Sequence, residues 1–261
     1  MQVHQAETAT SFRYAKGCAV DLYSLVRTAS KRLGRFDLSL LAADRAVRAA
    51  EAADDPLRLG LARWNLAHVL LADGLSEDAE LVAMWAADAL RPLIAEGGAE
   101  TAAVYGALLL LGAAAVARQG NTWTAHSRLR EAAPLADRTG ECNTLWTAFG
   151  PTNVAMYSVT VEIEAGEVLE GLRLAERIDH RCTPSIERRV AFLLDQAKGY
   201  EQHRDYAAAL VLLRTAERVA PEDIQHRPDA HAILHTVAKC GRRTVAAEAT
   251  QLASRVGLLL N

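Results

Sequence analysis

The sequence predicts an all-α protein, folded as a right-handed superhelical solenoid of about six antiparallel helix pairs. Three observations lead to this prediction. The strong helix formers Ala and Leu supply 87 of the 261 residues, whereas Pro is held to 7. Turn signals recur every 37 to 46 residues, and small residues lie at helical spacing on both sides of them. An ordinary Ala-rich helical bundle is the alternative.

The helix pairs are expected in order around six short turns. The two helices of each pair flank a turn at Gly34, Gly74, Gly120, Gly166, residues 203–205 or Gly241. Residues rich in Gly, Pro and Asp, which stop helices, connect successive pairs at 53–56, 95–98, 137–140 and 181–184. No linker divides the chain, so residues 1–261 are predicted to form a single domain.

The clearest repeat covers residues 190–221. Leu193, Ala197 and Tyr200 share one face of its first helix, and Pro221 follows the second. These residue types at these spacings are typical of a tetratricopeptide repeat. In such arrays each pair has an apolar face that only its neighbours can cover, and small Ala residues let the backbones approach closely.

Two stretches resemble the sensor region of a known group of regulators. They are Thr147-Ala-Phe-Gly-Pro-Thr-Asn-Val154 and the segment from Pro184 to Glu222. Similar stretches occur in the tetratricopeptide-like C-terminal region of actinobacterial helix-turn-helix regulators of the XRE family. The resemblance implies a solenoid that dimerises or binds a signal and so biases an attached DNA reader. Only about ten residues precede the first expected helix, so this chain itself is expected to lack the reader and not to bind nucleic acid.

One segment is apolar enough to raise the question of a membrane. Residues 101–117 contain no charge, and 17 residues is the lower limit for a span. The segment falls in register with the repeat, so a buried helix is the preferred interpretation. Without a signal peptide at the N-terminus, the expected location is the cytoplasm.

The first helix of each pair is expected to line the concave groove, where arrays of this kind hold ligands. The predicted ligand-binding residues are Trp64, His68, Asn153, Met156, Tyr157, Thr160, Lys198, His231 and His235. For Trp64, packing between neighbouring pairs is an equally good explanation. The expected ligand is a peptide, a small molecule or a protein.

The Phe149-Gly-Pro-Thr-Asn block predicts the start of a helix, because Pro suits the first turn and Thr152 or Asn153 can cap exposed amides. A ligand anion on those amides is the functional hypothesis, and a sharp chain reversal is the preferred structural one. The basic residues Arg27, Lys31, Arg32 and Arg35 are interpreted as a solvated helix end.

No catalytic residues, cofactor or metal site are predicted. His231 and His235 lie four residues apart, but two ligands do not make a catalytic zinc site. The four cysteines are widely spaced, and the net charge of −3 argues against binding nucleic acid through the whole surface. The apolar C-terminal residues 257–260 need a cover, either the last helix pair or a second copy of the chain in a homodimer.

These observations favour a non-enzymatic, cytoplasmic solenoid that senses a signal or binds a protein within a bacterial transcriptional regulatory system. One alternative is a freestanding adaptor that controls no promoter. The other is an enzyme of a biosynthetic pathway that uses the groove for chemistry.

Overall fold

The computed structural model describes the backbone of residues 2–259 and the side chains of residues 11–259. Within this part, the chain is 82% helix and has no strand, which confirms the all-α prediction. The α-helices are α1 Gln2–Arg32, α2 Phe36–Ala53, α3 Pro56–Ala72, α4 Ser76–Leu90, α5 Gly98–Arg118, α6 Thr122–Thr139, α7 Pro151–Glu164, α8 Val168–Ala175, α9 Ile186–Gln202, α10 Tyr206–Val219, α11 Pro221–His226, α12 Pro228–Cys240 and α13 Arg243–Arg255. Three short 3₁₀ helices are η1 Arg91–Leu93, η2 Thr144–Trp146 and η3 His180–Cys182.

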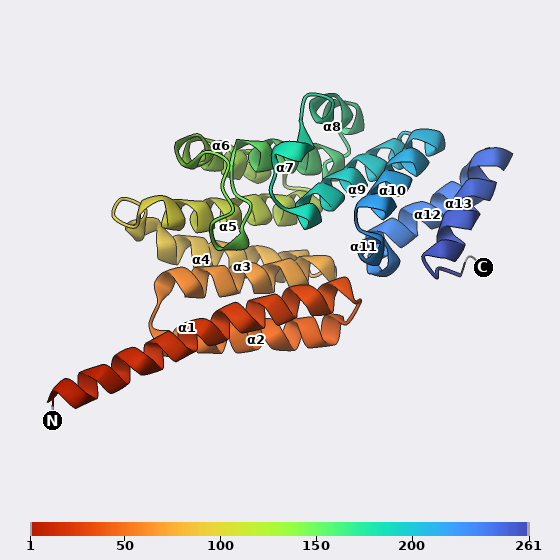
Figure 1. The fold of residues 1–261 in the computed structure, drawn as a ribbon. Helices are drawn as coiled ribbons and strands as arrows, with labels where there is room; N and C mark the ends of the chain where they lie inside the picture. Colours follow the sequence, from red (N-terminus) through yellow and green to blue (C-terminus); the bar gives the residue numbers. More distant parts are fainter. Residues whose placement is uncertain (1, 260–261) are drawn as a thin grey trace.

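The helices pack mostly with their neighbours in sequence, as a repeat-like array of pairs (Figure 1). The six expected turns are confirmed, because they separate α1 from α2, α3 from α4, α5 from α6, α7 from α8, α9 from α10 and α12 from α13. At the second turn Gly74 has a φ of 83°, a left-handed conformation that favours Gly. The fifth turn uses Arg204 in the same region, with a φ of 62°.

Polar caps explain where several helices begin. The side chain of Asp55 accepts a hydrogen bond from the backbone N–H of Arg58 at 3.0 Å, and Pro56 occupies the first turn of α3. Ser185 caps α9 in the same way, through the N–H of Arg188 at 3.2 Å. These local signals set the first residues of α3 and α9, two helices that line the cavity.

Helix α5 forms the centre of the largest apolar core. Every residue from Thr101 to Ala117 is buried, and the side chains of α3, α4, α6 and α7 surround it. Within the described residues, α5 is the one helix long and apolar enough to cross a membrane. Because 89% of its most apolar window is buried inside the protein, the structure supports the interpretation of this segment as a core helix.

Two elements differ from the sequence-based expectation. Helix α1 begins at Gln2, whereas about ten residues were expected before the first helix. Pro221 does follow the end of α10, but it also starts the short helix α11, because Pro fits the first turn of a helix as well as it stops one. Helix α11 therefore lies between the fifth and sixth pairs, where none was expected.

The array curves so far that its beginning touches its later part (Figure 1). Lys31 at the end of α1 pairs with Glu187 at the start of α9, with 2.8 Å between Nζ and Oε1. Arg32 pairs with both Asp223 and Glu222 of α11. We call these five residues the ion-pair clasp, because they join segments more than 150 residues apart in sequence.

Candidate ligand-binding cavity

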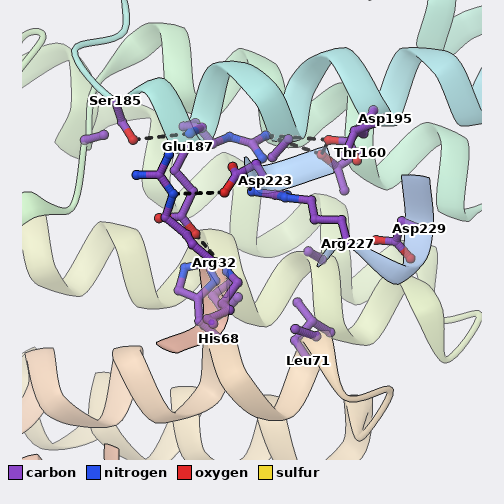
Figure 2. A pocket seen from close by; sticks show the side chains of 18 of the residues that line it. Arg32, His68, Leu71, Thr160, Ser185, Glu187, Asp195, Asp223, Arg227 and Asp229 are labelled. Carbon is purple, nitrogen blue, oxygen red and sulfur yellow. Dashed lines mark hydrogen bonds and ion pairs between the residues drawn. The ribbon is translucent and has the colours of Figure 1, made fainter. Parts of the chain in front are cut away.

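A cavity of about 190 Å³ lies on the inner side of the curved array, next to the ion-pair clasp (Figure 2). Helices α1, α3, α5, α7, α9 and α11 contribute side chains to its wall, as do the start of α12 and the segment 146–148. A single water needs about 10–15 Å³ of such space. The cavity therefore has room for roughly a dozen water-sized groups, which is the size of a small molecule.

On the side of α7 and α9, the polar groups bind one another. The guanidinium of Arg188 donates to Asn153 Oδ1 at 2.9 Å and lies 4.3 Å from the centre of the Tyr157 ring. Thr160 donates its hydroxyl proton to Asp195 at 2.6 Å, and Arg188 lies 3.8 Å from the same carboxylate. Burial raises the pKa of the Asp195 carboxyl. The Asn153 and Thr160 oxygens and the Asp195 carboxylate are thus engaged within the wall.

The clasp borders the cavity where the end of α1 meets the start of α9 and α11. The positive charge of Lys31 holds the pKa of the Glu187 carboxyl well below its usual range. Asp223 accepts from Arg32 at 3.0 Å and from Arg227 at 3.0 Å, so one buried carboxylate joins α1 to the start of α12. Figure 2 shows Arg32, Asp223 and Glu187 gathered at this edge. These carboxylates are also saturated by cations.

Two donors in the wall remain without a partner. Arg27 is 5% exposed, and its Nη2 donates to the neutral amide oxygen of Asn65, but its Nε has no hydrogen-bond partner. The indole Nε1 of Trp64 is likewise buried and unpaired. In the described part of the chain, Arg27 forms no ion pair with a carboxylate. One N–H of a buried guanidinium and one buried indole N–H thus lack an acceptor in this wall.

His68 lies beside these donors. Its ring meets the Trp64 ring edge-on, with 4.5 Å between the centroids. Burial lowers the pKa of the His68 imidazole well below its usual value, and the nearby charges of Lys31 and Arg27 lower it further. His68 is therefore neutral at pH 7.

Five of the nine sequence-predicted residues line the cavity: Trp64, His68, Asn153, Tyr157 and Thr160. The other four lie elsewhere. Met156 is one position from Tyr157, which turns it by about 100° around the helix, and it packs in the core with Phe192. Lys198 lies beyond the cavity on α9, where Glu164 holds its ammonium at 2.7 Å.

The two histidines of the sixth pair are also outside the wall. His231 contacts the backbone oxygen of Gln225 at 2.9 Å, and His235 is exposed. Helix α11 and the start of α12 line the cavity at this end of the array instead of these two side chains. In residues 11–259, no group of three or more His, Cys, Asp or Glu side chains is placed to hold a metal ion.

The start of α7 supports the structural interpretation of the Phe149-Gly-Pro-Thr-Asn block. The carboxylate of Glu141 accepts from the backbone N–H of Thr152 at 2.7 Å, so an acid of the chain itself already occupies the position proposed for an anion. Phe149 is fully buried against Gly106 of α5. The side chains of Thr152 and Asn153 do not cap the helix, and Asn153 instead faces the cavity.

The interpretation of the basic cluster as a solvated helix end is wrong for three of its four residues. Arg27 is buried, and Lys31 and Arg32 form the clasp, because the curvature of the array brings α9 and α11 onto the end of α1. Only Arg35 is exposed, paired with Asp37 next to it. The spacing of Arg27 and Lys31, one turn apart, is the signal that places both on the same inner face.

Trp146 stands at the edge of the cavity on an unusual segment. Leu145, Trp146 and Ala148 all have left-handed backbone conformations, with φ of 50°, 63° and 48°. Asn143 supports the segment by accepting from the N–H of Ala148 at 3.1 Å. The Trp146 side chain is 83% exposed, so most of its ring faces solvent although it borders the cavity.

Comparison with known proteins does not identify the chain. No family model matches it. No curated protein is similar enough to be identified as a relative. The resemblance to actinobacterial regulators stays a prediction, and the geometry of the cavity has to support any functional assignment.

Proposed function

We propose that the chain is a non-enzymatic, tetratricopeptide-like solenoid that binds a small molecule in its inner cavity. Its role would be that of a cytoplasmic sensor within a bacterial transcriptional regulatory system. The observation that supports binding is the cavity itself, which the inner helices line and which contains two buried, unpaired donors. Its volume favours a small molecule over an extended peptide or a protein among the ligands that the sequence leaves open.

The pairing of three wall carboxylates supports a binding role for them over a catalytic one. Glu187, Asp195 and Asp223 each face a cation of the wall, as the distances above show. A general base needs a carboxylate or an imidazole within reach of the proton that it removes. Carboxylates held in ion pairs instead fix the positions of helices, as a wall that keeps its shape requires.

Equilibrium dialysis of the protein against a small-molecule extract of its own host tests this proposal. The protein is first stripped by unfolding and refolding, and mass spectrometry then identifies enriched compounds. We expect the native sequence to enrich one compound or a few, and Trp64→Ala to lose this enrichment while its helicity is unchanged. Trp123→Ala is the matched control, because Trp123 is 74% exposed on α6 and does not line the cavity. Equal enrichment by both variants, or none by the native sequence, would contradict the proposal.

A surface on the first helix supports the further proposal that the chain forms a homodimer. Leu22, Leu25 and Val26 lie on one stripe of α1, three and four residues apart, and all three are exposed. Exposed apolar patches often mark contacts between proteins. At the C-terminus, which the sequence suggested as the dimer contact, Leu258 packs on the last helix pairs, Leu259 is exposed, and residue 260 lies outside the described residues.

A further inference from the structure

The unpaired groups of the cavity have one chemical property in common. Both Arg27 Nε and Trp64 Nε1 are hydrogen-bond donors, and the nearby carboxylates of Glu187 and Asp223 are already engaged by cations. An unsatisfied buried donor is costly to the folded state, and a buried charge without a partner more so. These two donors therefore lack acceptors, and a ligand that brings an acceptor can satisfy them.

The balance of charge in the wall points in the same direction. The whole chain has a net charge of −3, but the wall contains more cations than acids. Its cationic side chains are Arg27, Lys31, Arg32, Arg118, Arg188 and Arg227. Its acidic ones are Glu187, Asp195, Asp223 and Asp229. Five of these cations pair with carboxylates, and Arg32 and Arg118 do so with Glu222 and Glu164 outside the wall. Among the described residues Arg27 forms no ion pair, and this unmatched cation favours an anion over a neutral or cationic molecule of the same shape.

The rest of the wall is apolar and indicates the other part of the ligand. Trp64, Leu71, Leu111, Ala114 and Leu194 line the cavity together with the aromatic ring of Tyr157. Such surfaces bind apolar groups, and a few fixed polar groups then orient the molecule. Arg27 lies on α1 and Trp64 on α3, so one ligand could contact both neighbouring helices at once.

We propose that the cavity binds a small organic anion, a carboxylate or a phosphate with an apolar body, whose negative group pairs with Arg27. This proposal rests on the proposed function, since it names the chemical class of the molecule sensed. A buried guanidinium without an ion pair destabilises the folded protein, and binding this ligand gives Arg27 a function. The apolar body packs against Trp64, and the hydrogen-bonded residues of α7 and α9 form the far wall.

Isothermal titration calorimetry of the stripped protein, at low salt, tests the class of ligand. The probes are benzoate and phenyl phosphate as the two anions, benzamide and benzylamine as their neutral and cationic counterparts, and inorganic phosphate alone. We expect at least one of the two organic anions to bind about tenfold or more tightly than benzamide and benzylamine. Inorganic phosphate should bind more weakly than phenyl phosphate, because it lacks the apolar body. The stronger of the two organic anions identifies the acid group.

The matching variant is Arg27→Gln, which keeps a donor for Asn65 but removes the charge. We expect it to lose about tenfold or more in affinity for the preferred anion, with no fall in its melting temperature. Arg45→Gln is the control, because Arg45 is exposed on α2 and outside the wall, and it should bind as the native sequence does. Unchanged anion binding by Arg27→Gln, or no binding of either organic anion, would overturn the proposal.

The two experiments distinguish a wrong ligand class from the absence of any ligand binding. Should benzamide or benzylamine bind best, and should Trp64→Ala abolish that binding, the cavity is a ligand site for another class of molecule. Should no probe bind and the dialysis enrich no compound, both proposals fail together.

Discussion

Helix α5 and the wall of the cavity are both buried, but they are built from opposite residue types. Between Thr101 and Ala117 every residue of α5 is buried without a single charge. The cavity wall instead has buried or half-buried Arg, Lys, Asp and Glu side chains from α1, α9, α11 and the start of α12. The first region is stabilised by removal of apolar surface from water, whereas the second depends on charges that must be matched across the array.

The largest loss of stability on substitution is expected in the apolar core. Phe149 is fully buried, and its ring leaves no room for even a Cβ at Gly106, where such an atom would lie 2.1 Å from the ring. Phe149→Ala should lower the free energy of unfolding by about 3–5 kcal/mol, measured by denaturant titration. Phe12→Ala is the control, because Phe12 is 52% exposed and its loss should cost about 0.5 kcal/mol or less. Similar values for the two variants would show that this part of the core is not packed as described.

A smaller effect is expected at the ion-pair clasp. Glu187→Gln keeps the shape of the side chain but removes the partner of Lys31, whose side chain is only 15% exposed. The free energy of unfolding should fall by about 1–2 kcal/mol, since the pair is partly buried. Glu77→Gln is the control, because Glu77 also lies in the first turn of a helix but is exposed. It should cost less, and equal losses would mean that the clasp contributes nothing beyond the helix dipole.

Titratable groups in the cavity wall should make the free energy of unfolding depend on pH, whereas the uncharged core of α5 should not. The pKa of His68 is lowered in the folded protein, mainly by burial, whereas the unfolded chain binds a proton near pH 6.5. Stability from this group is fully present above pH 6.5 and is lost as pH falls below it, by at most about 1.4 kcal/mol per pH unit. His68→Gln should therefore flatten the loss of stability between pH 6.5 and 5, measured by denaturant titration at each pH.

The exposed His235 provides the control for this prediction, and His235→Gln should leave the pH profile unchanged. Glu187 affects the free energy of unfolding over a lower pH range. Its folded pKa is lowered, so its contribution is present above about pH 4.5 and is lost as pH falls below that value. A parallel profile for native protein and His68→Gln would contradict the burial of a neutral imidazole in the wall.

The same contrast explains what the sequence could predict. The uncharged segment 101–117 and the recurring Gly turns are local signals, so the helix pairs and the buried α5 follow from the chain read in order. Inward positions on α3 and α7, such as Trp64 and Tyr157, follow from helical spacing and line the cavity as expected.

The charged wall could not be predicted in this way. Lys31 and Glu187 are 156 residues apart, and the pairing depends on how far the array curves, which small differences between successive pairs determine. The short helix α11 adds to the difficulty, because Pro221 is equally suited to end α10 and to begin a new helix. From the local sequence Arg27 and Lys31 therefore look like solvent-exposed charges, although α9 and α11 cover them in the structure.

Native mass spectrometry of the protein purified from its own host, before and after mild unfolding, tests the central claim most directly. It reports the number of subunits and any bound small molecule in one spectrum. The account predicts an added mass of a small organic anion that is retained in the native state and released on unfolding. A native mass equal to that of the polypeptide alone, or to a whole multiple of it, would contradict the claim that the cavity holds a ligand.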